Sequence, residues 1–263
     1  MIGPRRYPGP IRLLAILLGH TGYLVGIIGF LSILLPLSLV FLPSPKLRKK
    51  LLRGLMRIFL RFLTQWWLPI LGIYRFRSVT GEIHPGKGPV IYVANHIGVL
   101  DAPMMLSFVM NTSVVIKQKH ARLPIYAALV RYVDFVAAQP GSLESLGRMY
   151  ADCLSILKSG TNVLIFPEGT RSRQGRLGAF RDSAFRLGAQ TGRAVVPVAI
   201  FSEVPFMTKA WRSYFPAKRF AYDVRFLPPV FAEEGERSAQ FAERVRKMIA
   251  AELKNAQALS VRT

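Results

Sequence analysis

An almost uninterrupted apolar stretch, residues 13–42, limits how this chain can fold more than any other feature. About 20 helical residues cross the hydrocarbon core of a bilayer, so a stretch of this length can span a membrane or enter it and return. Cationic residues precede the stretch, and a cationic cluster at residues 46–53 follows it. Cationic flanks prefer the cytoplasmic side, so two of them favour a re-entrant segment or hairpin that breaks near residues 26–29 or Pro36. A single span remains open.

Residues 46–67 have the pattern of a basic amphipathic helix. Apolar residues recur on one helical face, while Arg53, Arg57 and Arg61 repeat every fourth residue on another. A helix of this kind that ends in two tryptophans is typical of the membrane interface. The alternative is a helix that packs on a protein core and leaves its Arg face in water. Together, residues 1–72 are predicted to form a helical membrane-anchoring motif.

The composition favours attachment to an anionic surface. The chain has 36 Lys and Arg against 14 Asp and Glu, a formal net charge of +22, and 51% hydrophobic residues. Each Lys or Arg near an anionic leaflet contributes about 1 kcal/mol to binding. Nucleic-acid binding also explains the charge but not the apolar N-terminus, so no nucleic acid is expected. Cys153 is the single cysteine, which excludes an intramolecular disulfide and fits a reducing compartment.

Beyond residue 72 short apolar runs alternate with helical patterns, and residues 73–254 are predicted to form one α/β domain. Several runs are apolar throughout, as strands buried on both faces are. The alternation predicts a mostly parallel sheet flanked by helices with right-handed crossovers. Residues 255–263 are expected to be a frayed tail. Strands are expected at residues 74–79, 90–94, 113–116, 134–137, 163–166, 194–201 and 222–227, and helices at residues 103–110, 123–133, 143–158, 182–190 and 239–253.

Two of the predicted strands end in polar loops. The first is followed by Asn95 and His96, with Asp101 where a helix would begin. Loops after strands are where α/β proteins place their chemistry. A histidine and a carboxylate this close can share a hydrogen bond that fixes the imidazole tautomer and raises its basicity. A loop histidine beside a helix-capping aspartate is the structural alternative.

The second polar loop runs from Glu168 to Arg173 and contains Gly169 and Arg171. The glycine gives the backbone freedom to present its N–H groups, and two arginines offer planar, bidentate binding of anions. The loop therefore suits a phosphate or another anionic head group, with a solvated basic turn as the alternative. The nucleotide-binding and serine-hydrolase motifs GxGxxG and GxSxG are not found, and the histidine spacing predicts no metal site.

The two stretches together, Asn-His-x-x-x-x-Asp and Phe-Pro-Glu-Gly-Thr-Arg-Ser, resemble the lysophospholipid acyltransferase family, typified by bacterial 1-acylglycerol-3-phosphate acyltransferases. The resemblance covers residues 88–200 and implies acyl transfer from acyl-CoA or acyl carrier protein to the free hydroxyl of a lysolipid, without a cofactor. It implies His96 and Asp101 as the catalytic pair. It also implies a substrate-binding set that comprises Asn95, Gly98, Glu168, Gly169, Thr170, Arg171, Arg173 and Pro197.

Two positions depart from the family. Gly98 stands where the family usually has Ser, and residues 135–139 lack the Arg that phosphatidate-forming members use for the acceptor phosphate. The acceptor most directly implied is 1-acylglycerol-3-phosphate, in phospholipid biosynthesis, but a lyso-ornithine lipid or a lysophospholipid stays open. Arg122, Arg131 and Arg148 are candidates to compensate. A non-catalytic lipid-binding membrane protein is the rival from another class.

The expected chemistry is general-base catalysis. An alcohol is a poor nucleophile, so a base within roughly 2.6–3.2 Å must take its proton as attack develops. His96 is expected to be that base, with Asp101 orienting the ring and stabilising the imidazolium. The thioester supplies a good leaving group, so no covalent enzyme intermediate is needed. We expect the catalytic domain to face the cytoplasm at the inner (cytoplasmic) membrane, with membrane lipids, the lysolipid and the acyl donor as partners.

Overall fold

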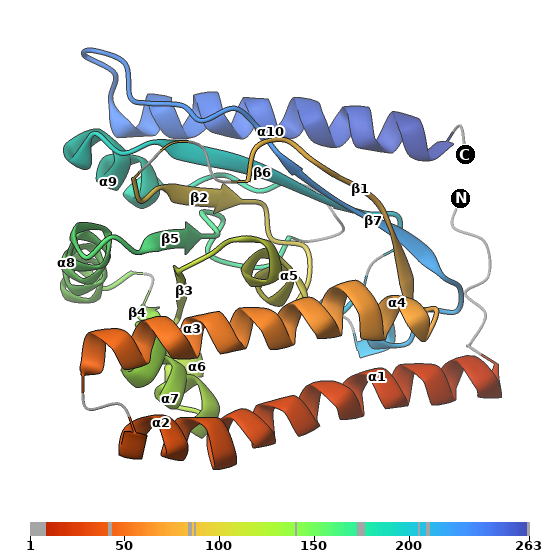
Figure 1. Ribbon diagram of the computed structural model, residues 1–263. Coiled ribbons are helices and arrows are strands. Elements are labelled where there is room, and N and C mark those ends of the chain that lie inside the picture. Colours follow the sequence, from red (N-terminus) through yellow and green to blue (C-terminus); the bar gives the residue numbers. More distant parts are fainter. Residues whose placement is uncertain are drawn as a thin grey trace.

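The computed structural model describes residues 9–41, 44–83, 86, 88–139, 141–172, 177–204, 206–208 and 211–261. In this part of the chain the strands are β1 (Tyr74–Thr80), β2 (Ile91–Ala94), β3 (Thr112–Lys117), β4 (Val136–Ala138), β5 (Asn162–Ile165), β6 (Val195–Ser202) and β7 (Phe220–Phe226). They form a seven-stranded sheet in the order β1-β7-β6-β2-β5-β3-β4 (Figure 1). All neighbouring pairs are parallel except β6 and β7. The predicted α/β class with a mostly parallel sheet is confirmed.

Helices cover both faces of this sheet (Figure 1). One face packs on α8 (Leu143–Lys158), α9 (Ser183–Thr191) and α10 (Ser238–Val261). The other face packs on α5 (Asp101–Phe108), α7 (Pro124–Val133) and the N-terminal helices. Two short helices, α6 (Gln118–Ala121) and the 3-10 helix η3 (Trp211–Tyr214), lie in connections.

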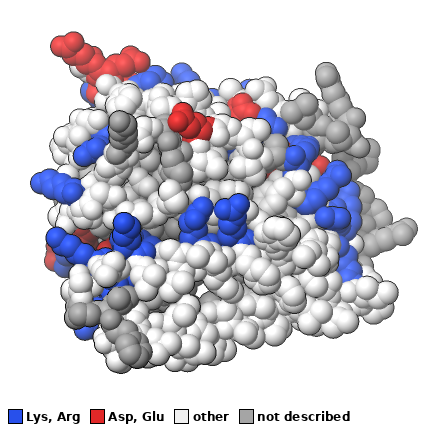
Figure 2. Space-filling view, in the orientation of Figure 1, with Lys and Arg blue, Asp and Glu red and all other residues white. Residues whose placement is uncertain are grey.

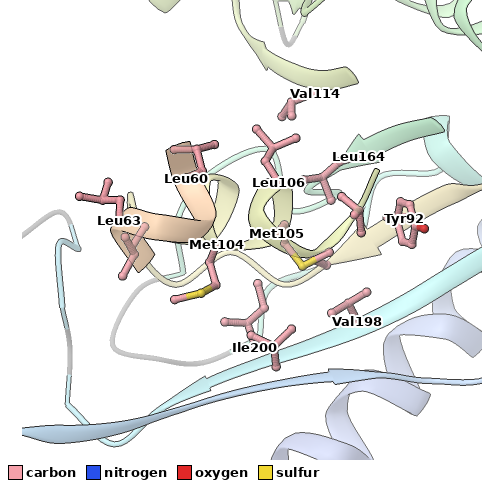
Figure 3. Close-up of a cluster of buried hydrophobic side chains, with 14 of the residues drawn as sticks. Leu60, Leu63, Tyr92, Met104, Met105, Leu106, Val114, Leu164, Val198 and Ile200 are labelled. Atoms are coloured by element: carbon pink, nitrogen blue, oxygen red, sulfur yellow. The ribbon is translucent and has the colours of Figure 1, made fainter. Parts of the chain in front are cut away.

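Strand β2 shows how alternating side chains build the two cores. Ile91 and Val93 pack toward α8, α9 and α10, while Tyr92 and Ala94 pack toward α5. All four side chains are buried, as expected for a central parallel strand covered on both faces. In Figure 3, α5 side chains lie between the helix that carries Leu60 and Leu63 and the sheet that carries Tyr92, Val198 and Ile200. Helix α5 is thereby held where β2 ends.

The N-terminal apolar stretch is one continuous helical rod. Helix α1 (Pro10–Gly29) passes through a π-helical turn, η1 (Phe30–Leu34), into α2 (Leu35–Phe41) without reversing. The expected break near residues 26–29 or Pro36 is therefore wrong, because the wider π turn directly before Pro36 accommodates its missing N–H donor. Among the described residues, Pro10–Val40 is one helix long and apolar enough to cross a membrane by length and composition.

The chain reverses after α2 and returns antiparallel as α3 (Pro45–Phe62), a second π turn η2 (Leu63–Trp67) and α4 (Leu68–Ile70) (Figure 1). Glycines on α1 allow the two rods to approach closely. A Cβ at Gly26 would lie 1.8 Å from the Phe59 ring, and one at Gly22 would lie 2.5 Å from the Trp67 indole nitrogen. Aromatic rings thus occupy the space that larger side chains on α1 would need.

Helix α3 packs on the α/β domain through Leu52, Met56 and Leu60, which are buried. This is the core-packing alternative, and it corrects the placement of Arg53 on an interfacial stripe. Arg53 is buried, and its guanidinium donates to Asp134 Oδ2 at 2.9 Å and to Asn111 Oδ1 at 2.9 Å. These partners stand far away in the sequence, so the local helical pattern did not indicate them. The outer side of α3 and η2 still exposes Leu51, Ile58, Phe62 and Trp66.

The remaining predicted helices and strands are present, most of them with shifted ends. The largest difference is at the C-terminus, where α10 continues to Val261 although residues 255–263 were expected to be a frayed tail. The helix continues because Ala256 is buried and its carbonyl oxygen accepts a hydrogen bond from Arg77 Nη2 at 3.0 Å. The short helix α6 was not expected.

Candidate active site

The loop after β2 brings His96 and Asp101 into contact. His96 Nδ1 lies 2.7 Å from Asp101 Oδ2, and Asp101, the first residue of α5, is fully buried. The same carboxylate oxygen accepts hydrogen bonds from the backbone N–H groups of Ile97 at 2.6 Å and Gly98 at 2.8 Å. Because the carboxylate accepts, Nδ1 is the protonated ring nitrogen and Nε2 carries the lone pair. The imidazole, 22% exposed, can therefore act as a base through Nε2.

A tyrosine that the sequence analysis missed completes the surroundings of Asp101. The Tyr222 hydroxyl on β7 donates to Asp101 Oδ1 at 2.7 Å. Burial raises the pKa of Tyr222 well above its usual range, so the hydroxyl stays protonated and donates. Nothing in the sequence pattern joins a strand residue this far along the chain to the loop after β2.

The side chain of Asn95 fixes the loop after β2 to the neighbouring strand β6. Its Nδ2 donates to the carbonyl oxygen of Ile200 at 2.9 Å, and its Oδ1 accepts from the N–H of Ile200 at 2.7 Å. The side chain is buried and so joins the end of β2 to β6. Pro197 is also buried, within β6 and in register with Val93 of β2, before the edge of the sheet where His96 lies. Both residues support the site from inside the protein.

Glu168 binds the second polar loop to the first. Its Oε1 accepts from the N–H of His96 at 2.9 Å, and its Oε2 accepts from the N–H of Gly178 at 2.9 Å. Burial raises the pKa of Glu168, and the two backbone N–H donors oppose that shift. The N–H of Ser172 also donates to the His96 carbonyl oxygen at 2.6 Å. Both carboxylate oxygens of Glu168 therefore accept hydrogen bonds from the backbone of the protein.

The rest of the second loop points toward residues 206–208. Arg171 Nη1 donates to the carbonyl oxygens of Met207 at 3.1 Å and Thr208 at 2.8 Å. Gly169 adopts a left-handed conformation with φ of 63°, which favours glycine, and Thr170 is half-buried. The other predicted anion-binding arginine, Arg173, lies outside the described residues. Arg171 thus contacts backbone carbonyls at the edge of the site.

Residues 206–208 also explain why Gly98 departs from the family pattern. The N–H of Val99 donates to the Met207 carbonyl oxygen at 2.8 Å. This bond holds the segment against the loop of residues 95–100, called the histidine loop below. A Cβ at position 98 would lie 2.4 Å from the carbonyl oxygen of Phe206. An ordinary contact needs more than 3 Å, so a serine does not fit without movement of the segment.

An apolar cavity of about 400 Å³, measured with its open mouth, lies beside the histidine loop. Its wall comes from α1, from the η2–α4 turn, from the loop that precedes α5 and from residues 206–207. A hydrocarbon chain would find apolar contacts here. The lining residues are Gly19, His20, Tyr23, Leu63, Leu68, Ile73, Val99, Leu100, Pro103, Phe206 and Met207.

A cluster of basic side chains lies at the same edge of the sheet, where β3 and β5 end. The pKa of His120 is lowered by burial and then by the positive charges of Lys119, Lys117 and Arg171. Lys117, the last residue of β3, directly follows three apolar residues, and this was a usable signal for the cluster. The three arginines that the sequence analysis considered have other surroundings. Arg122 and Arg131 are exposed, and Arg148 forms an ion pair with Glu144 on α8.

Comparison with known proteins places both polar loops in one family segment. Residues 76–201 match the family model described as Acyltransferase. The chloroplastic 1-acyl-sn-glycerol-3-phosphate acyltransferase of Arabidopsis thaliana is 33% identical over 148 residues, 55% of this chain and 41% of the relative. The enzyme of the same name from Borreliella burgdorferi is 28% identical over 134 residues, 50% of this chain and 53% of the relative. The chain therefore spans about half the length of these curated relatives.

The fold is also known from a crystal structure. The 1-acyl-sn-glycerophosphate acyltransferase PlsC from Thermotoga maritima superposes with a TM-score of 0.76 over 94% of this chain and 96% of that one, at 22% identity. This likeness shows a shared fold. Residues 76–201, which match the Acyltransferase family model, include His96, Asp101 and the loop from Glu168 to Arg171.

Proposed function

We propose that this protein is an O-acyltransferase of phospholipid biosynthesis. It would transfer a fatty acyl group from a thioester, acyl-CoA or acyl carrier protein, to the free hydroxyl of 1-acylglycerol-3-phosphate. The observation that carries the proposal is the 2.7 Å contact between His96 Nδ1 and Asp101 Oδ2, which leaves Nε2 to act as a base. Val99 and Leu100, in the same loop, line an apolar cavity. The names of the relatives from Arabidopsis thaliana and Borreliella burgdorferi support the same reaction.

The mechanism follows from the orientation of the imidazole. His96 Nε2 takes the proton of the acceptor hydroxyl while its oxygen attacks the thioester carbonyl carbon. The tetrahedral intermediate then collapses, the C–S bond breaks, and the departing thiolate takes the proton back from the imidazolium. Asp101 stabilises the imidazolium between these steps. General-base catalysis of this kind contributes about 10²–10⁴ in rate.

The acceptor phosphate would lie against the basic cluster of Lys117, Lys119, His120 and Arg171. Burial, and then the charges of the three cations, lower the pKa of His120, so a dianionic phosphate would be attracted to the same place. The cluster could thus replace the Arg that residues 135–139 lack. Arg171, whose Nη1 contacts two backbone carbonyls, would keep its other donors for the head group.

Membrane attachment is the second part of the proposal. Large apolar side chains of α1 and α2 face outward, among them Ile11, Val25, Ile28 and Val40. Figure 2 shows Lys and Arg gathered in a row at the level of α3, above a largely uncharged surface that corresponds to α1 and α2. We infer that α1 and α2 enter the bilayer while cations on α3 meet anionic head groups on the cytoplasmic side of the inner membrane.

The catalytic proposal is tested by acyl transfer with the purified full-length protein in lipid vesicles. Both thioester donors are offered with 1-acylglycerol-3-phosphate and, in parallel, with lysophosphatidylcholine and lyso-ornithine lipid. We expect transfer to 1-acylglycerol-3-phosphate, abolished by His96→Ala while vesicle binding remains. The absence of transfer from either donor to any of these acceptors, with lysolipid binding intact, would favour a non-catalytic lipid-binding protein.

The membrane proposal is tested by vesicle flotation. Reversing the exposed α3 charges with Lys46→Glu and Lys50→Glu should weaken binding to anionic vesicles and reduce its dependence on salt. The matched control reverses Lys247 and Lys254, which are exposed on α10 on the opposite side of the sheet (Figure 1). Equal effects of the two double variants would contradict the proposed orientation.

A further inference from the structure

Tyr222 is joined to the candidate base through Asp101. It lies on β7, outside residues 76–201 that match the family model, yet its hydroxyl is 2.7 Å from Asp101 Oδ1. Both side chains are buried, Tyr222 with 2% and Asp101 with 0% of their surface exposed. A hydrogen bond between two groups so far from water is strongly directional and costly to lose.

The two oxygens of Asp101 have different partners. Oδ2 accepts from His96 Nδ1 and from two backbone N–H groups of the same loop, whereas Oδ1 accepts from Tyr222. The loop after β2 can therefore hold one oxygen by itself. The second oxygen accepts its hydrogen bond from a side chain of another strand. Tyr222 therefore restricts the rotation of the Asp101 carboxylate about its Cβ–Cγ bond.

Few ionisable groups face this pair in the described structure. His96 approaches Asp101 from the loop after β2, and Glu168 approaches from the loop after β5 with a pKa that the Asp101 charge helps to raise. Tyr222 approaches from β7, and the ring of Tyr74 on β1 lies 5.7 Å from the Tyr222 ring. Removing the Tyr222 hydroxyl would therefore leave His96 as the nearest group to respond to the carboxylate.

We propose that Tyr222 is a positioning residue for acyl transfer, which acts by fixing the Asp101 carboxylate and tempering its negative charge. This inference rests on the proposed function. Without the hydroxyl donor the carboxylate turns more easily, and its less compensated charge favours the protonated imidazolium over the neutral base. At a given pH a smaller fraction of His96 is then ready to take a proton, and the ring is aimed less well.

The test compares Tyr222→Phe with Tyr74→Phe. Tyr74 is a matched control because it is fully buried in the neighbouring strand and donates its hydroxyl to the Thr64 carbonyl oxygen rather than to Asp101. Loss of one hydrogen bond to a charged group predicts a fall in kcat of about tenfold to a hundredfold for Tyr222→Phe. Acceptor KM should change little, and the acidic limb of the pH–rate profile should move to higher pH. Tyr74→Phe should keep the wild-type profile.

A second measurement reads the imidazole without acyl transfer. Diethyl pyrocarbonate modifies neutral imidazole, and mass spectrometry of the peptide that contains His96 gives the rate at each pH. The midpoint should rise in Tyr222→Phe and not in Tyr74→Phe, with thermal melts confirming that both variants fold. Unchanged kcat, pH limb and midpoint in Tyr222→Phe, or equal changes in both variants, would overturn the inference. A wild-type protein that transfers no acyl group would refute the proposed function, and the modification midpoint would then decide on Tyr222 alone.

Discussion

Replacing Gly98 by alanine should disturb the site although it adds a single methyl group. The new Cβ would lie 2.4 Å from the Phe206 carbonyl oxygen, a distance that side-chain carbons do not tolerate. The obstacle is backbone rather than a flexible side chain, so residues 206–208 must move away from the histidine loop. The hydrogen bond from the N–H of Val99 and those from Arg171 all end on this segment.

The magnitude follows from these contacts. A neutral hydrogen bond contributes about 0.5–1.5 kcal/mol and one to a charged group about 1.5–3 kcal/mol. Loss of the Val99 bond and weakening of the Arg171 bonds therefore amounts to about 2 kcal/mol. For a chain of this size that corresponds to a fall in melting temperature of about 4–8 °C. Phe206 and Met207 also line the cavity, so the KM of the substrate whose acyl chain lies there should rise.

Thermal unfolding in detergent and acyl-transfer kinetics measure both effects. The control is Gly147→Ala on α8, where an added Cβ meets nothing within 4 Å. That variant should gain roughly 0.5–1 kcal/mol, because alanine has the higher helix propensity. Wild-type melting and kinetics in Gly98→Ala would show that residues 206–208 do not constrain the histidine loop.

Three further outcomes are expected. Asp101→Asn should fold but lose about 10²–10⁴ in kcat, since the amide cannot stabilise an imidazolium as the carboxylate does; transfer assays at several pH values check this. Arg53→Met should lower the unfolding free energy by about 1.5–3 kcal/mol in denaturant titrations, because Asp134 loses its bond to Arg53 and keeps its ion pair with Lys49. Burial raises the pKa of Glu168 above its ordinary 4.5, so its stabilising contribution is present below pH 4.5 and is lost as pH rises through the raised pKa. Melting curves at several pH values should therefore show wild type losing stability relative to Glu168→Gln as pH rises.

Much of the fold could be predicted because it depends on local patterns. The positions of the strands could be predicted from apolar runs and turn residues. The end of the β2 run predicted that His96 lies in a loop before a helix that begins with Asp101. The unpredicted parts depend on contacts between distant segments. Arg53 is buried because the fold brings Asp134 within hydrogen-bonding distance of it. Asn95 and Glu168 were predicted to bind substrate, and their polar atoms form hydrogen bonds with the backbone of the protein.

The sheet order has a consequence for how the protein is made. Strand β1 joins the sheet only through β7, which lies between β1 and β6 and is synthesised long afterwards. A chain that emerges N-terminus first therefore keeps β1 without a strand partner until nearly the whole chain has left the ribosome. The same late strand brings the Tyr222 hydroxyl to Asp101. We expect a nascent chain that stops before β7 to contain every signature residue and still lack a finished site.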